Sequence, residues 1–150
     1  MNASTTAPIT GGCQCGAVRY ALDSAPNYRH FCHCRMCQRA VGGPFAALGA
    51  VPRGEHRWTR GEPGYFASST AARRGFCRDC GTPLSFEYLD STHINVTLCS
   101  LDDPAPFAPA QHFGIESQLP WLHLADDWPR EGTLVNSPRL QNMQSFQKTE

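Results

Sequence analysis

Short hydrophobic stretches, each bounded by glycine, proline, aspartate or serine, recur along most of the chain. Stretches of this length and composition are typical of β-strands, and five are predicted, at residues 17–22, 45–51, 64–68, 83–88 and 93–99. In the last stretch hydrophobic and polar residues alternate, which places Ile94, Val96 and Leu98 on one face of the strand and Cys99 on the other. The pattern therefore predicts many short strands.

Helical character is confined to residues 34–41, which are followed by Gly42 and Gly43. Residues 1–10 and 129–150 are expected to be poorly packed tails. The chain of 150 residues has the length of one domain. Together these features predict a small all-β domain with at most one or two short helices.

Composition agrees with a fold rich in turns, because glycine and proline supply 13 and 12 residues. Hydrophobic residues make up 41% of the chain and charged residues 17%, which excludes a coiled coil, a helical bundle and a fully disordered chain. The formal net charge is zero, so no nucleic-acid or membrane partner is expected. The first residues lack a secretory leader pattern, and we therefore expect a cytoplasmic protein.

Charge is nevertheless unevenly distributed along the chain. Residues 19–78 hold ten arginines and three acidic residues, a net charge of +7, whereas residues 79–150 have a net charge of −7. The simpler interpretation is a solvated surface with two opposing halves. The functional interpretation is an electropositive face that compensates thiolate charge and attracts a small anionic ligand.

Seven of the eight cysteines fall into three clusters: Cys13 and Cys15; Cys32, Cys34 and Cys37; Cys77 and Cys80. In a reducing compartment, clustered cysteines are more often metal ligands than disulfides. Cysteines separated by one or two residues can direct two sulfur atoms to one ion from a tight turn, and neighbouring glycines allow that turn. The clusters therefore predict bound zinc.

The spacing divides these cysteines most economically into two zinc sites per chain. Four ligands form one site: Cys13, Cys15, Cys77 and Cys80. Three ligands form the other: Cys32, Cys34 and Cys37. Closed four-ligand sites are structural, whereas catalytic zinc keeps an open position beside three protein ligands. We therefore expect a structural first site and a catalytic second site, with a second structural site, completed by a distant residue, as the alternative.

Three residues are candidates for the fourth ligand of the second zinc. His33 lies between two ligands, so its side chain is expected to point away from the metal. His30 could reach the site or hydrogen-bond a thiolate. Cys99 is the third candidate, although a small buried apolar residue is its simpler interpretation.

Four segments carry a resemblance to a known family. They are GGCQCGAVRY at residues 11–20, HFCHCRMCQRAVGGPF at 30–45, RGFCRDCGTPL at 74–84 and SLDDP at 100–104, followed by Trp121. In order and spacing they resemble the glutathione-dependent formaldehyde-activating enzyme family, whose domain is shared with centromere protein V. The resemblance covers residues 11–128 and implies one twisted all-β domain organised around two zinc ions. It also implies the same division into a structural and a catalytic set of cysteines.

The family resemblance implies a carbon–sulfur lyase that joins glutathione and formaldehyde into S-hydroxymethylglutathione, or acts on a related thiol–aldehyde adduct. Its partner would be a small thiol, with an arginine among Arg35, Arg39, Arg73 and Arg74 holding a carboxylate. Cys99 departs from the family, because many relatives have glycine before SLDDP. Two other functions stay open: a zinc-held module that binds a thiol or protein without turnover, and a zinc site that releases its metal on oxidation.

Overall fold

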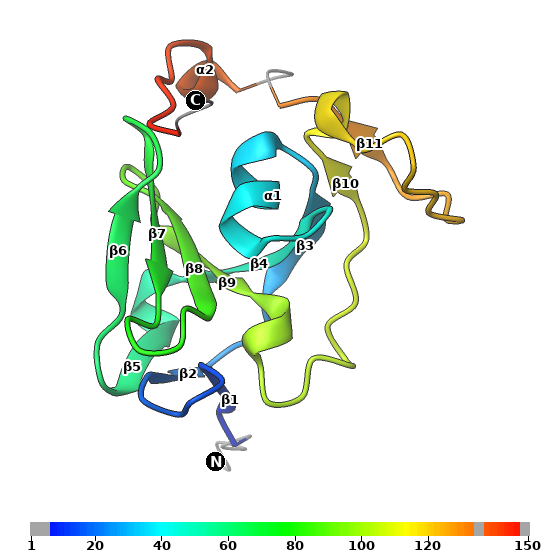
Figure 1. Cartoon of the computed structure of the whole chain (residues 1–150). Coiled ribbons are helices and arrows are strands. Elements are labelled where there is room, and N and C mark those ends of the chain that lie inside the picture. Colours follow the sequence, from blue (N-terminus) through cyan, green and yellow to red (C-terminus); the bar gives the residue numbers. More distant parts are fainter. Residues whose placement is uncertain (1–6, 134–136, 148–150) are drawn as a thin grey trace.

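The structure is a computed structural model that describes residues 7–133 and 137–147. Within these residues the strands form two sheets (Figure 1). The smaller sheet has the order β1-β2-β5 and contains β1 (Ile9–Gly12), β2 (Arg19–Leu22) and β5 (His56–Arg60). The larger has the order β11-β10-β3-β4-β9-β8-β7-β6 and contains β3 (Asn27–Cys32), β4 (Ala46–Pro52), β6 (Gly64–Ala67), β7 (Ala72–Phe76), β8 (Pro83–Tyr88), β9 (His93–Thr97), β10 (His112–Phe113) and β11 (Arg130–Glu131).

Helices are few and short in the described part of the chain. The α-helices are α1 (Arg35–Val41) and α2 (Pro138–Gln141), and the 3-10 turns are η1 (Arg53–Glu55), η2 (Leu98–Ser100) and η3 (Ile115–Ser117). The sequence-based prediction of an all-β fold with at most two short helices is confirmed. None of these helices is long and apolar enough to cross a membrane.

The larger sheet buries one face against the smaller sheet. Strand β9 shows the arrangement, because Ile94 and Val96 are buried in the core that also contains Tyr20 and Leu22 of β2. Asn95, between them, points to the other face and lines a cavity there. The predicted alternation along this strand is therefore confirmed, and it separates a packed face from a hollow one.

The strand expected at residues 93–99 ends two residues early. The Thr97 hydroxyl donates a hydrogen bond to the Pro83 carbonyl at 2.8 Å, and the Ser100 hydroxyl donates one to the Thr97 carbonyl at 2.8 Å. These bonds turn the chain into η2, where Leu98 is buried and Cys99 is exposed. The expectation of a buried Cys99 is therefore wrong.

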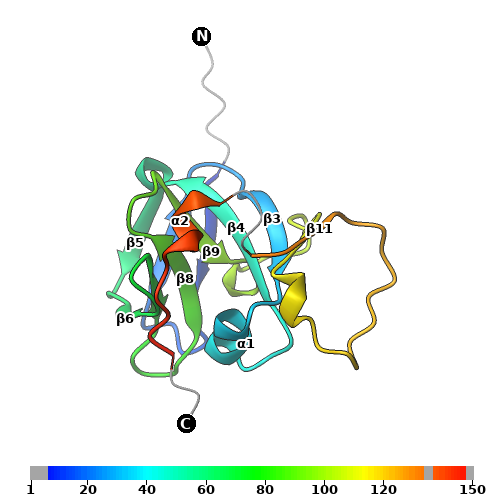
Figure 2. The ribbon, with the colours of Figure 1, turned by 90° about the horizontal axis from the view of Figure 1, so that it is seen from above.

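Two segments of the C-terminal region differ in how closely they pack against the sheets. Residues 118–129, between η3 and β11, form a wide loop at one side (Figure 2). Residues 138–147, in the expected tail, lie along the chain before β7: the Thr70 amide donates to the Gln144 carbonyl at 2.9 Å, and Leu140 is buried. The domain limits of 11–128 stay a prediction.

Candidate metal centres

The four cysteines predicted to share the first site lie together where the β1–β2 hairpin meets the turn between β7 and β8. Their sulfur atoms all lie within 4.8 Å of one another, and they belong to Cys13, Cys15, Cys77 and Cys80. The Cys13 and Cys15 sulfurs are 3.6 Å apart, and those of Cys15 and Cys77 are 3.7 Å apart. Sulfurs placed tetrahedrally at ~2.3 Å from zinc are about 3.8 Å apart. The cluster therefore fits one thiophilic ion.

Each pair of cysteines in this cluster is held by a tight turn. The Gly16 amide donates to the Cys13 carbonyl at 3.1 Å, and the Gly81 amide donates to the Cys77 carbonyl at 2.9 Å. Both glycines have positive φ, +80° and +78°, a conformation that side chains with a Cβ rarely adopt. The glycines beside the cysteines are thus required by the turns.

Thr82 connects the two turns and was not singled out by the sequence pattern. Its hydroxyl accepts a hydrogen bond from the Gln14 amide at 3.0 Å and lies 3.2 Å from the Cys80 sulfur. Hydrogen bonds from Thr82 lower the pKa of the Cys80 thiol to about 5. A hydroxyl two residues after the last cysteine is the signal that could have identified it.

The remaining three clustered cysteines form a second group on the opposite, hollow face of the larger sheet. Cys32 ends β3, Cys34 precedes α1 and Cys37 lies in its first turn, and their sulfur atoms are within 4.8 Å of one another. The Cys34 sulfur caps the helix by accepting from the Cys37 amide at 3.4 Å. Three soft sulfur donors suit the same class of ion, with one position left for another ligand.

Within the described residues, this second group contains none of the candidate fourth ligands. The His30 Nδ1 lies 2.7 Å from the Tyr28 carbonyl, and its ring lines the cavity beside the cysteines. Burial lowers the pKa of His30. Cys99 is exposed in η2, outside this group.

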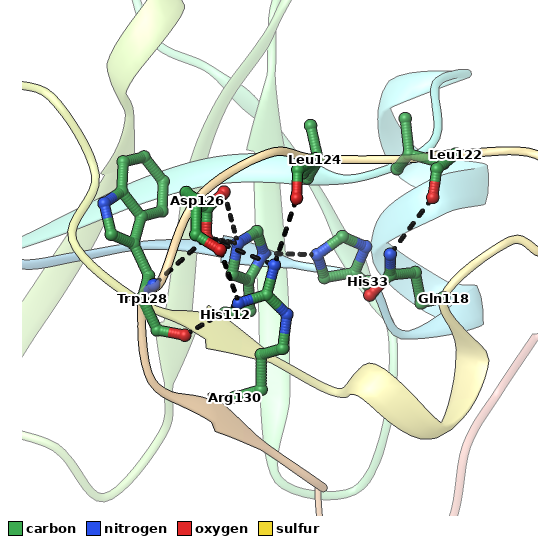
Figure 3. A network of polar contacts seen from close by, with 8 residues as sticks. All are labelled: His33, His112, Gln118, Leu122, Leu124, Asp126, Trp128 and Arg130. Atoms are coloured by element: carbon green, nitrogen blue, oxygen red, sulfur yellow. Dashed lines mark hydrogen bonds and ion pairs between the residues drawn. The ribbon is translucent and has the colours of Figure 1, made fainter.

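His33 is not part of the sulfur cluster, and its side chain lies in a buried polar network (Figure 3). Its Nε2 lies 2.8 Å from Nδ1 of His112, and Nε2 of His112 lies 3.0 Å from the Asp126 carboxylate. Because a carboxylate only accepts, Nε2 of His112 donates to Asp126, and in the neutral ring Nδ1 then accepts from His33. Burial opposes ionisation of Asp126, but the hydrogen bonds from His112 and the Trp128 amide leave its pKa lowered.

Arg74 is the cation that the structure brings to the second cluster. It comes from β7, its Nη2 donates to the Cys37 sulfur at 3.4 Å, and its guanidinium lies 4.8 Å from the ring centre of Phe86. Hydrogen bonds from the Cys32 and Cys34 thiols, together with Arg74, hold the pKa of Cys37 well below its ordinary value. The site therefore favours thiolate at Cys37.

The other three arginines suggested by the sequence have different surroundings. Arg73 pairs with Glu87 at 3.1 Å, and Arg35 donates to the Gln38 side chain. Arg39 lines a second groove, and Arg74 lines both this groove and the cavity. Among these arginines, only Arg74 lines the cavity itself.

The cavity has a volume of about 240 Å³ and has Cys32, Cys34 and Cys37 in its wall. Its floor is the hollow face of the larger sheet, from β10 to β7, and α1 closes one side. Leu140 and Met143 of the C-terminal segment also line it. A reactant held there would lie beside the three sulfur atoms.

Comparisons with known proteins agree with this architecture. An uncharacterized lyase of Schizosaccharomyces pombe is 32% identical over 78 residues, a match that covers 52% of this chain and 56% of that protein. The chain thus spans just over half the length of this relative. The chain also matches the crystal structure of a Rhodobacter sphaeroides protein, with a TM-score of 0.57 and 23% sequence identity. The match covers 69% of this chain and 99% of that protein's chain, and the two share the fold. The family model described as glutathione-dependent formaldehyde-activating enzyme matches residues 8–117, and the chain belongs to this family.

Proposed function

We propose that the protein is a zinc-dependent carbon–sulfur lyase that makes and breaks the bond between a thiol and an aldehyde at the second cysteine cluster. The observation that carries the proposal is that this cluster, with three sulfur donors, lies in the wall of the cavity. The family's description suggests glutathione and formaldehyde as the reactants. A matched relative is also named a lyase.

Two zinc ions would have different roles in this proposal. Cys13, Cys15, Cys77 and Cys80 would hold a structural ion, and Cys32, Cys34 and Cys37 the second. When bound, the second ion supplies Lewis acidity and favours the thiolate form of a bound thiol. The chain's residues would hold the reactants beside it.

The reaction needs no oxidant or reductant. In the forward direction the thiol sulfur forms a bond to the aldehyde carbon, and the thiol proton ends on the aldehyde oxygen; cleavage reverses both steps. The cavity wall would replace part of the water around the reactants, which strengthens charge interactions beside the sulfur atoms. Arg74 would balance negative charge at Cys37, to which it donates.

The direct test is the rate at which S-hydroxymethylglutathione forms from glutathione and formaldehyde, measured against the spontaneous reaction. We expect acceleration by the zinc-loaded protein and none by Cys37→Ser. A folded, fully loaded protein that binds the thiol without acceleration would instead be a thiol-binding module. Loss of metal on mild peroxide treatment, without catalysis, would favour the redox-linked alternative.

A further inference from the structure

We infer that the cavity takes a thiol, or its aldehyde adduct, with a largely apolar body and a single anionic group. The inference rests on the proposed function and narrows its substrate. Three observations support it: the composition of the cavity wall, the unpaired Nε of Arg74, and the C-terminal segment that contributes to the wall.

The exposed area of the cavity wall is mainly apolar, although serine, threonine, asparagine and glutamine side chains also line it. Besides the cysteines, its apolar and aromatic members include Met36, Leu48, Phe86, Phe113, Leu140 and Met143. Apolar area removed from water contributes about 25 cal/mol per Å² to binding. A ligand with an aromatic or aliphatic body would therefore gain more here than a polar peptide.

Among the described residues that line the cavity, Arg74 is the only arginine, and none of the others is a lysine, an aspartate or a glutamate. Its Nη2 donates to Cys37, but its Nε is buried without a hydrogen-bond partner in the described chain. An unpaired buried donor is costly, and a charge-assisted bond to an anion relieves that cost. The guanidinium can thus bind one anionic group.

Glutathione matches this wall poorly. At neutral pH it carries two carboxylates and an ammonium group, whereas the described lining offers one cation and no carboxylate to pair with the ammonium. Burying a charge without a partner is unfavourable. The mismatch applies to the body of the thiol and leaves the chemistry at its sulfur unchanged.

The cover over the cavity lies outside the part of the chain that matches the family. The family model ends at residue 117, whereas Leu140 and Met143 belong to the segment held by the Thr70–Gln144 backbone bond and by Arg139, which pairs with Asp90 at 2.8 Å. Specificity for an apolar body is therefore built partly from residues that the family pattern does not include.

Calorimetric titration of the zinc-loaded protein under reducing conditions tests this inference. The probes are para-(mercaptomethyl)benzoate, benzyl mercaptan and glutathione. We expect the benzoate thiol to bind at least about tenfold more tightly than glutathione, since ring burial is worth more than 1.4 kcal/mol. We also expect it to bind about tenfold more tightly than benzyl mercaptan, which lacks the carboxylate.

Two pairs of variants locate the effect. Arg74→Met should abolish the preference for the benzoate thiol over benzyl mercaptan, whereas Arg57→Met, in an exposed ion pair with Asp23, should retain it. Met143→Glu should weaken binding of the benzoate thiol at least about tenfold relative to Met143→Gln, because it places a carboxylate in the wall. This second pair keeps the test decisive if Arg74→Met does not fold.

Glutathione binding as tightly as the benzoate thiol, or Met143→Glu behaving like Met143→Gln, would overturn the inference and leave the proposed function standing. Absence of binding by every thiol to fully loaded protein would overturn the proposed function, and the inference with it.

Discussion

His33 stabilises the segment between Cys32 and Cys34 without belonging to the sulfur cluster. It is completely buried, and its hydrogen bond to His112 connects this segment to Asp126 in the wide loop. Groups that orient a ligand-bearing segment from outside commonly tune metal affinity. The network of Figure 3 is therefore a support for the second cluster.

Replacing His112 by Phe should weaken that support. His33 would lose its acceptor, and an unpaired buried donor costs about 1–3 kcal/mol. We expect a lower free energy of unfolding in urea and faster zinc release to a chelator. Asp126→Asn, which keeps an acceptor for His112, should have a smaller effect on both measurements. Equal effects of the two substitutions would contradict the hydrogen-bond chain.

Asp102 gives a pH-dependent contribution to stability. Hydrogen bonds from Arg19 and Thr10 lower its pKa to about 2, from an ordinary value of 3.8. A carboxyl with a lowered pKa stabilises the fold above its unfolded pKa, and this stabilisation is lost as pH falls through the folded pKa. The pair is partly exposed, so we expect less than about 1 kcal/mol.

The measurement for Asp102 is the difference in Tm between wild type and Asp102→Asn. Wild type should melt higher near neutral pH, and the difference should shrink as pH falls from about 4 towards 2. Because both proteins carry the same cysteines, loss of metal in acid largely cancels in the difference. A difference that grows in acid would count against the ion pair.

At the scale of elements, the two cysteine clusters differ in what they connect. The first joins the β1–β2 hairpin to the β7–β8 turn, and Cys15 and Cys77 are 62 residues apart. The second connects only the end of β3 to the adjoining α1. Metal bound between distant segments closes a long loop, so its binding energy is also folding energy.

Cys77→Ser should therefore lower Tm by at least about 10 °C, whereas Cys34→Ser should lower it by only a few degrees. Calorimetry of zinc-loaded samples measures both. Serine keeps the size of the side chain in each case, which makes the two variants a matched pair. Equal decreases in Tm for the two variants would show that the clusters do not divide into a structural and a catalytic site.

Strands β7 and β8 and the turn η1 are connected through one buried carboxylate. Glu87 is 2% exposed and binds Arg53 at 2.5 Å and Arg73 at 3.1 Å. Removing one partner of a buried ion pair leaves the other charges uncompensated.

We expect Glu87→Gln to lower the free energy of unfolding in urea by about 2 kcal/mol, a value reduced because both arginines are partly exposed. Asp23→Asn is the control, since Asp23 pairs with Arg57 at the surface. It should change stability by less than about 0.5 kcal/mol. If Glu87→Gln has the same free energy of unfolding as Asp23→Asn, the ion pairs of Glu87 do not stabilise the fold.

The elements foreseen from sequence are those whose signals are local. Strand β8 occupies residues 83–88 as predicted, and α1 ends where Gly42 adopts φ +64°. Strand β7 was missed because Arg73 and Arg74 obscure its pattern, and their partners, Glu87 and Cys37, come from elsewhere in the fold.

For the site, too, local sequence signals could be predicted, whereas features that depend on tertiary contacts could not. The cysteine spacing was sufficient to predict which sulfurs group together, and the structure groups them in that way. The cavity could not be foreseen, because Leu140 and Met143 reach its wall only through tertiary contacts. Neither could the His33–His112–Asp126 chain, whose members are separated by 79 and 14 residues.

At the scale of the whole molecule, the positive and negative halves of the sequence meet in ion pairs. Arg19 pairs with Asp102, and both Arg53 and Arg73 pair with Glu87. These pairs connect residues 19–78 to residues 79–150, so part of the apparent positive excess is neutralised inside the fold. Arg74, which hydrogen-bonds Cys37, is the arginine that lines the cavity.

We propose that each chain holds two metal ions, one bound by four sulfur atoms and one bound by three sulfur atoms beside the cavity. Native mass spectrometry of protein purified without chelators measures this directly. We predict two zinc ions per chain in wild type and one in Cys37→Ser, with the remaining ion lost only on unfolding. A fully folded wild-type protein that holds one zinc or none, and does not gain a second when zinc is added, would contradict the account.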